Sequence, residues 1–450
     1  RAFVEEQREI LQRYSAEEPV LTVNEPSLMK IPHVDRFSLV EQETVTSLNT
    51  CPAEYKDYAR TAAALDGARS HRHRPFWVFQ RLSPKPGRRQ SAPPRPGRIR
   101  LWSYQSLARG AELLTFLRWR TPASGQRMFQ PGLLKHDGAP GRVYEEVRGL
   151  VGELKENARH WEGREPVSKV GMIIDYPSAW GMESVQRGGD LDYWQRVEDL
   201  HALLSHRGLP VDFPGEHSDF DCYDLLVAPS LFICSARLAE KLELFVHHGG
   251  QLLVTAPAGY NTQTNSREQG HAPGPLTDLL GVAVREDDYR PDGAENSIRI
   301  QSTGRTYPVG PYCGILELRG AESVGTYGEQ FYAGAPAVTR RETGEGSALF
   351  LGADAGGDLV GDLLDTMLEA ADVGAIPWAS DSVEVVPLGP GKNDAGRAFV
   401  LNHGDEAASL ELERETQDLL SGETHAGEIT LKPGGVALVE FPTDRHASPT

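Results

Sequence analysis

Residues 223–255 read YDLLVAPSLFICSARLAEKLELFVHHGGQLLVT and decide the fold of the middle of the chain. The apolar run at 223–228 predicts a buried strand, and residues 236–248 place apolar side chains at helical spacing. The glycine pair at 249–250 is typical of a helix C-cap, and a second buried strand follows at 251–255. Strand, helix and strand in this order predict a parallel α/β sheet.

The same alternation continues on both sides of this stretch. We predict strands at 170–174 and 347–351, and helices at 190–206 and 358–371. Together these elements indicate an open, doubly wound sheet of the flavodoxin type over residues 166–376. The first strand is not followed by G-x-G-x-x-G, so a bound dinucleotide is not implied.

Residues 380–445 have the pattern of a small antiparallel β-sandwich, because short alternating runs are separated by Gly, Asn and Asp turns. The stretch GPGK at 389–392 has a faint likeness to a phosphate-binding loop. It lacks the flanking strand and helix, so we interpret it as a turn. The strands are predicted at 383–386, 397–401, 409–412 and 436–441.

Residues 1–163 read as about four strand–helix units, half of what a (β/α)8 barrel needs. We therefore expect a partial TIM barrel, about strands 5 to 8, with the first half before Arg1. A long loop at 83–98, rich in Pro, Gly and Arg, follows the third strand; it is a solvated loop or a site for an anionic ligand. The strands are predicted at 19–23, 44–47, 75–79 and 113–116, and the helices at 1–14, 54–67, 102–109 and 143–160.

The composition is that of a globular protein, with 39% hydrophobic and 24% charged residues. The net charge of −18 argues against a nucleic-acid partner, and no run of 18 apolar residues predicts a membrane span. Arg (37) far outnumbers Lys (9), which fits either a salt-adapted organism or a GC-rich genome. Few cysteines in a long chain suit a reducing compartment, so we expect a cytoplasmic protein.

The four cysteines, Cys51, Cys222, Cys234 and Cys313, form no C-x-x-C pair. A zinc site is therefore not expected, and the simplest interpretation is four buried free thiols. We predict neither a metal nor a cofactor.

Several long stretches resemble the family 42 glycoside hydrolases of β-galactosidase type. These enzymes have a barrel, a flavodoxin-like trimerisation domain and a small β-domain, so the resemblance implies a homotrimer acting on galactosides. The likeness covers nearly the whole chain, which makes it far more specific than a match to a short motif. It rests on RAFVEEQREILQRYS (1–15), PFWVFQ (75–80), PRPGRIRLWSYQSLARGAE (94–112), RWR (118–120), GLLKHDG (132–138), DLDYWQRVEDLHALLSHRGLPVD (190–212) and 223–255.

The resemblance also implies which residues should carry the chemistry. Retaining glycosidases need two carboxyl groups about 5–5.5 Å apart. In the family the nucleophile is a Glu at the end of the strand that reads PFWVFQ, where this chain has Gln80. The acid/base Glu belongs to an Asn-Glu motif on the fourth barrel strand, which would lie upstream of Arg1. None of Glu41, Glu43 and Glu54 matches the nucleophile position.

Neighbouring family positions have changed as well. A Trp that stacks on the sugar falls at Arg88, and a Glu and a His that bind galactose hydroxyls fall at Arg127 and Gln130. Asn49 is kept, while Leu48 and Cys51 stand where the family usually has Trp and Tyr. Changes at several positions of one pocket indicate that galactose cleavage is no longer under selection.

Two rival interpretations involve other residues. Asn24-Glu25-Pro26 ends a strand and is similar to the acid/base motif of other barrel glycosidases, so Glu25 is an alternative catalytic acid. The middle domain also resembles glutamine amidotransferases, which use a Cys–His pair. Cys222 and Cys234 lack the expected tight turn, and His247 and His248 end a helix, so catalysis there is not expected.

These observations predict a β-galactosidase-family hydrolase that is inactive by itself, because the acid/base strand is absent and Gln80 replaces the nucleophile. The alternative is a non-catalytic carbohydrate-binding or assembly subunit that partners an active paralogue or an upstream half-chain.

Overall fold

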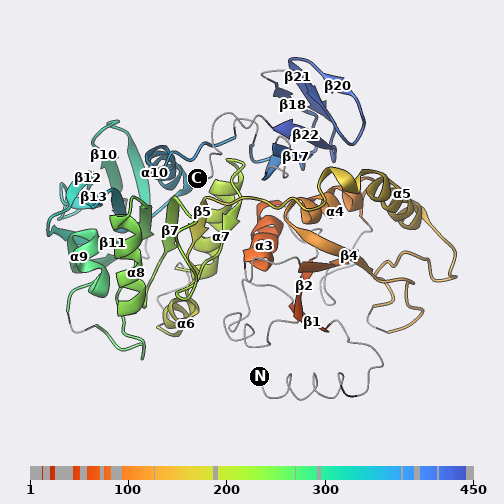
Figure 1. Cartoon of the computed structure of the whole chain (residues 1–450). Helices are drawn as coiled ribbons and strands as arrows, with labels where there is room; N and C mark the ends of the chain where they lie inside the picture. Colours follow the sequence, from red (N-terminus) through yellow and green to blue (C-terminus); the bar gives the residue numbers. More distant parts are fainter. Residues whose placement is uncertain are drawn as a thin grey trace. The chain divides into compact units, whose positions relative to one another are not determined.

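The computed structural model describes most of the chain, and its contacts divide into two compact units (Figure 1). The first unit comprises residues 1–167, 204–210 and 376–450, and the second comprises 168–203 and 211–375. The described residues are 13, 21–25, 44–50, 58–70, 76–82, 94–125, 127–185, 191–268, 270–290, 295–376, 379–389, 396–412 and 415–441.

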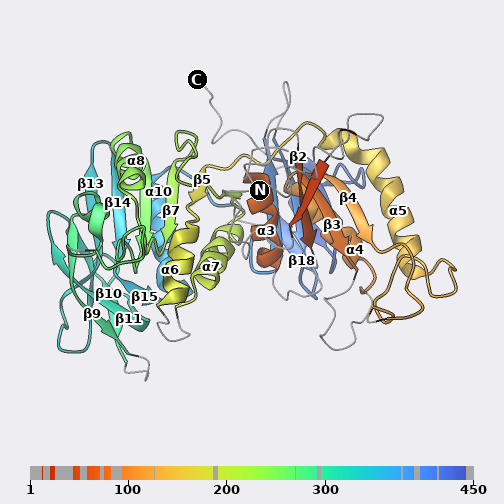
Figure 2. The same cartoon turned by 90° about the horizontal axis from the view of Figure 1, so that it is seen from below.

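A parallel sheet of four strands lies at the centre of the first unit, with its strands paired in chain order. The second, third and fourth of them are labelled in Figure 2. All four strands were predicted from the sequence. The larger (β/α)8 barrel stays a prediction, because the described strands form an open sheet with β1 and β4 at its edges. The elements are β1 (Leu21–Glu25), β2 (Thr44–Thr50), β3 (Phe76–Arg81), β4 (Ala111–Leu117), α3 (Tyr58–Ser70), α4 (Arg98–Ala108) and α5 (Arg142–Asn157).

The two faces of β3 differ in burial because side chains alternate along a strand. Phe76, Val78 and Gln80 are fully buried, whereas Trp77 and Phe79 are partly exposed. A hydrogen bond between Ser103 of α4 and Gln80 identifies the buried face as the one that α4 covers.

The C-terminal strands belong to the first unit and share a core with α4 and α5. Ile99 and Val147 of these helices are buried in one cluster with Phe399 and Leu438. A second apolar cluster lies between the antiparallel sheet β16-β17-β22 and the ribbon β18-β21, as expected for a small β-sandwich. The bounds are β16 (Val383–Leu388), β17 (Gly396–Asn402), β18 (Ala408–Glu411), β19 (Thr416–Gln417), β20 (Thr424–His425), β21 (Glu428–Leu431) and β22 (Val436–Phe441).

A buried ionic network also holds these segments together. Arg109, which is 1% exposed, forms ion pairs with Asp66 of α3 and, at 2.7 Å, with Glu384 of β16. The other carboxylate oxygen of Glu384 accepts hydrogen bonds from Gln105 Nε2 and His403 Nε2, each at 2.8 Å. Burial alone would raise the pKa of Glu384, but Arg109 and His403 outweigh it and hold the pKa below its ordinary value.

The second unit is built on a sheet of eleven strands, five of which are parallel. Numbered along the chain, these five lie in the order 2-1-3-4-5, the order of the flavodoxin type predicted for residues 166–376. The second of them, at Val211–Asp212, was not among the predicted strands. The five are β5 (Val170–Met172), β6 (Val211–Asp212), β7 (Leu225–Pro229), β8 (Gln251–Thr255) and β14 (Gly346–Leu351), with helices α7 (Tyr193–Ser205), α8 (Ala236–His247) and α10 (Gly357–Ala370).

An antiparallel extension of this sheet was not predicted. Its strands are rich in charged and polar residues and lack the long apolar runs of the parallel strands. The sequence pattern therefore did not identify them as strands. They are β9 (Val282–Tyr289), β10 (Ser297–Ile300), β11 (Thr306–Leu318), β12 (Glu322–Tyr327), β13 (Pro336–Thr343) and β15 (Ala353–Ala355); helices α6 (Tyr176–Ser184) and α9 (Thr277–Leu280) were missed as well.

Apart from Arg13, the predicted helix at 1–14 lies outside the described residues, as does most of the predicted turn at 389–392. No helix of the described chain combines the length and the apolar character that crossing a membrane requires.

We expect Arg109→Met to lower the free energy of unfolding by about 3–5 kcal/mol, because the buried Glu384 loses its arginine and the buried Asp66 keeps only Arg69. Urea unfolding monitored by circular dichroism measures this change. Arg148→Met is the matched control, since Arg148 is exposed and, among the described residues, pairs only with Glu145 one helical turn away. Its effect should stay within about 0.5 kcal/mol. Equal effects of the two substitutions would contradict the proposed importance of the network.

We also expect the destabilisation caused by Glu384→Gln to depend on pH. The folded pKa of Glu384 is lowered, so the carboxylate stabilises the fold above its unfolded pKa of about 4.3 and loses this effect as the pH falls through the folded value. The difference in unfolding free energy between wild type and variant should therefore shrink from about pH 7 to about pH 3.5. A difference that does not change with pH would argue against an ionised Glu384.

Candidate functional site

The candidate site lies at the carboxyl ends of the four parallel strands, where α/β proteins place their ligands. Gln80 is next to last in β3, and its side chain is fully buried. Its Oε1 accepts a hydrogen bond from Ser103 Oγ at 3.2 Å. Its Nε2 is buried too, and within the described part of the chain it has no hydrogen-bond partner.

This geometry limits what position 80 can do. The carboxamide lies on the face covered by α4, whereas Trp77 and Phe79 lie on the other face of the strand. A neutral amide is a poor nucleophile, and a buried, unpaired amide N–H costs about 1–3 kcal/mol. Ser103, the partner of Gln80, carried no signal in the sequence beyond its place in a helix.

Two other predicted positions lie on neighbouring strands at the same end of the sheet. Asn49 is next to last in β2 and pairs in register with Phe79. Glu25 is the last residue of β1 and pairs in register with Leu48. The roles of Asn49 and Glu25 stay predictions. Positions 41, 43, 51, 54 and 88 lie outside the described residues, and with them Glu41, Glu43, Cys51, Glu54 and Arg88.

The segment after β4 brings Arg127 and Gln130 together. The backbone N–H of Gln130 donates to the carbonyl of Arg127 at 3.0 Å, which closes a turn. Arg127 is exposed, and it lies close enough to Arg118 to affect that side chain electrostatically. Burial, followed by repulsion from Arg127, lowers the pKa of Arg118. This end of the sheet is therefore positively charged where the resemblance implies a carboxylate.

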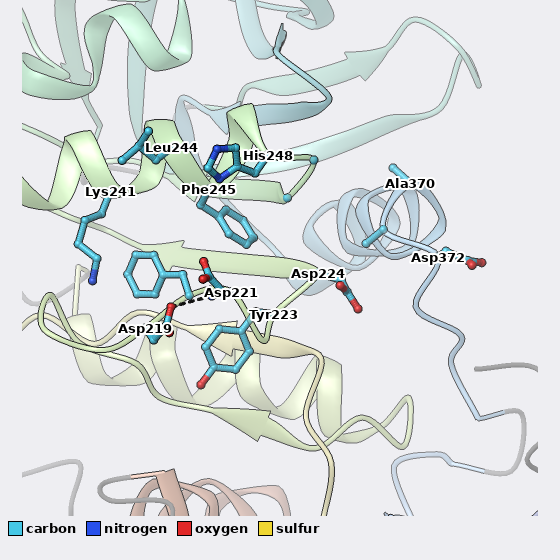
Figure 3. A pocket seen from close by; sticks show the side chains of 14 residues that line it. Asp219, Asp221, Tyr223, Asp224, Lys241, Leu244, Phe245, His248, Ala370 and Asp372 are labelled. Atoms are coloured by element: carbon cyan, nitrogen blue, oxygen red, sulfur yellow. Dashed lines mark hydrogen bonds between the residues drawn. The ribbon is translucent and has the colours of Figure 1, made fainter. Parts of the chain in front are cut away.

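A second candidate is a hollow of about 610 Å³ in the second unit (Figure 3). Asp219, Asp221, Asp224 and Asp372 line it, and Lys241 lies at its side. Asp224 directly precedes β7, so the hollow is at the amino ends of the parallel strands. Ligands of such sheets bind at the carboxyl ends, so this position does not indicate a ligand site.

The cysteines of the second unit are unsuited to nucleophilic catalysis. Cys234 is 5% exposed, and burial, together with Asp175 and Glu216, raises its pKa to about 12. Its thiol therefore stays protonated at neutral pH. Among the described residues, neither Cys222 nor Cys234 forms a hydrogen bond with a histidine, and His247 and His248 contact each other edge to face.

Burial of the thiols was predicted correctly for Cys234 and Cys313 but wrongly for Cys222, which is exposed. Cys222 belongs to the turn that precedes β7, where it is exposed together with Asp221, whereas Phe220 and Tyr223 are buried. In the part of the chain that the structure describes, no group of three or more His, Cys, Asp or Glu side chains could hold a metal ion.

Comparison with known protein families identifies the family of the chain. Three family models match it: "Beta-galactosidase" over residues 1–157, "Beta-galactosidase trimerisation domain" over 168–374 and "Beta-galactosidase C-terminal domain" over 397–441. The chain belongs to glycoside hydrolase family 42. The three matches follow one another in the order of the strands and helices described above, and the second covers nearly the same residues as the second unit.

Individual family 42 relatives agree with this assignment. The β-galactosidase BgaH of Haloferax lucentense is 31% identical over 83% of this chain and 54% of its own length. The β-galactosidase LacZ of Heyndrickxia coagulans is 28% identical over 98% of this chain and 65% of its own. The crystal structure of β-galactosidase from Bacillus circulans sp. alkalophilus superposes with a TM-score of 0.90 at 25% identity, over 98% of this chain and 66% of its own. The chain thus spans between half and two thirds of these relatives.

Exposure of Cys222 predicts selective alkylation. In the native protein at about pH 8, iodoacetamide should modify Cys222 first, because Cys234 and Cys313 are buried. Peptide mass spectrometry follows each thiol separately, and denaturant should make all of them react. Modification of native Cys234 as fast as Cys222 would contradict the burial described above.

Proposed function

We propose that this chain is a family 42 protein that binds β-galactosides through the carboxyl ends of its parallel strands and does not hydrolyse them by itself. Kinship with several β-galactosidases supports the substrate class. The observation that carries the absence of hydrolysis is the fully buried carboxamide of Gln80 at the position that the family resemblance gives to the nucleophile.

Electrostatics around this position supports the same conclusion. A retaining glycosidase stabilises positive charge on the sugar with a carboxylate. Gln80 is neutral, and Arg118 and Arg127 add positive charge at the same end of the sheet. An oxocarbenium-like transition state would be repelled by these groups, and each lost polar contact costs about tenfold or more in rate.

A second candidate function is an assembly subunit that completes its site with another polypeptide. The observation in its favour is the edge strand β4, which reads AELLTFL and leaves its leucines partly exposed. All-parallel sheets are normally covered on both faces, and an apolar edge strand favours pairing with a further strand. The partner would be an active paralogue or another polypeptide that pairs along β4.

We also propose a homotrimer, assembled through the second unit. The match of that unit to a trimerisation domain supports this proposal. Native mass spectrometry of the full chain tests it, and a monomer at micromolar concentration would contradict it.

We expect no measurable hydrolysis of a chromogenic β-galactoside by the purified chain, in low salt or in molar salt. Gln80→Glu should not create activity, because the new carboxyl group would be buried beside Ser103 with no cation among the described residues, and burial would favour its neutral form. The free energy of unfolding of this variant should also be about 1–3 kcal/mol lower than that of the unmodified chain.

Gln80→Met is the matched control, since it removes the unpaired Nε2 while keeping the volume. It should be equally inactive but at least as stable as Gln80→Glu. Turnover by the unmodified chain would overturn the proposed inactivity and make Glu25 the first residue to test as the catalytic carboxylate. Turnover only after mixing with an active relative would favour the assembly function.

A further inference from the structure

The segments that follow β3 and β4 are strongly basic in an acidic chain. Residues 118–136 contain four Arg or Lys side chains and no Asp or Glu, although the chain carries a net charge of −18. Residues 81–100, which run from the end of β3 into α4, contain seven Arg or Lys side chains and again no Asp or Glu. Both strands are parallel, so both segments start from the same end of the sheet.

The arginines after β4 are not neutralised by the protein. Within the described residues, Arg118 and Arg127 form no ion pair with a carboxylate. Burial, followed by repulsion from Arg127, lowers the pKa of Arg118. Arg120 is held by a neutral group, since its Nε donates to the carbonyl of His136 at 3.1 Å. Elsewhere in the first unit arginines do pair with carboxylates, as Arg100 does with Glu153 at 2.5 Å. Like charges held together repel, so this arrangement favours a bound anion.

Exposed apolar side chains lie among these arginines. Trp119 is 62% exposed, Phe129 is 67% exposed and Leu117 is 40% exposed. Trp119 is held edge to face against Tyr144, with 6.3 Å between the ring centres, so its indole has a fixed orientation. An exposed aromatic face offers an apolar surface to the C–H face of a sugar ring, while guanidinium groups bind carboxylates or sulfates with two hydrogen bonds each.

We propose that this arginine surface, formed by Arg118, Arg120, Arg127, Trp119 and Phe129, binds a saccharide that carries an oxyanion, either a carboxylate or a sulfate. The proposal rests on the proposed function and narrows its substrate class from galactosides in general to anionic ones. A polyanion such as nucleic acid is disfavoured, because the rest of the chain is acidic and would repel it.

Two ligands that differ in one group provide the test: methyl β-D-galactopyranoside and its uronide, in which the C6 hydroxymethyl is a carboxylate. Isothermal titration of the full chain should give an affinity for the uronide at least about tenfold higher at low salt. The preference should fall in roughly 0.5 M salt, because exposed charges are screened. Arg118→Gln and Arg127→Gln should each bring the ratio of the two affinities towards one.

Arg148→Gln serves as the matched control, because Arg148 lies on α5 and is paired with Glu145. It should keep the wild-type ratio. Thermal unfolding of every variant verifies folding, and inorganic sulfate as a competitor separates a saccharide site from a general anion site. Sulfate that displaces the uronide completely at equal concentration would overturn the saccharide part of the proposal.

The remaining outcomes separate this inference from the proposed function. If the neutral galactoside binds as tightly as the uronide, the inference fails while the proposed function stands. If neither sugar binds, the proposed function fails as well. If the uronide binds equally well after both arginine substitutions, its site lies elsewhere, and the arginine surface is not the binding site.

Discussion

The first unit depends on one buried cation. Arg109 lies between Asp66 of α3 and Glu384 of β16, residues more than three hundred positions apart in the sequence. Each carboxylate would be costly to bury alone, and the guanidinium can pair with both only when the helices and the C-terminal strands are in place. The network therefore couples the parallel sheet, through its helices, to the β-sandwich. The sheet, its helices and the β-sandwich, held together by this network, thus support the carboxyl ends of β3 and β4.

Most of the fold followed from local sequence patterns. Apolar runs located β7, β8 and β14, and the spacing of apolar residues located α8 and α10 within about one residue. The antiparallel extension β9 to β13 was missed, because its strands alternate polar and apolar residues irregularly and depend on pairing partners distant in the chain. The network around Arg109 was missed for a related reason: nothing in the sequence indicates which arginine meets which carboxylate.

The site was predicted mainly through resemblance, and the structure adds what resemblance could not supply. The sequence showed an amide at position 80, but its contact with Ser103 and the unpaired Nε2 appear only in three dimensions. Likewise, Arg127 was noticed as a replaced residue, whereas its nearness to Arg118 and the exposure of Trp119 depend on the turn after β4. Charge composition along 118–136 was the available signal for that surface.

The surroundings of Gln80 have a consequence for the history of the protein. One nucleotide change can convert a glutamine codon to a glutamate codon, so the acid is within easy reach of mutation. Among the described residues, however, the acid would meet a single hydroxyl donor and no cation, and burial would favour its protonated form. A charged carboxylate could return only after another substitution had rebuilt the α4 side of the pocket. Replacing glutamate by glutamine at position 80 thus takes a single step. Restoring a charged glutamate requires the substitution on the α4 side first and the change at position 80 second.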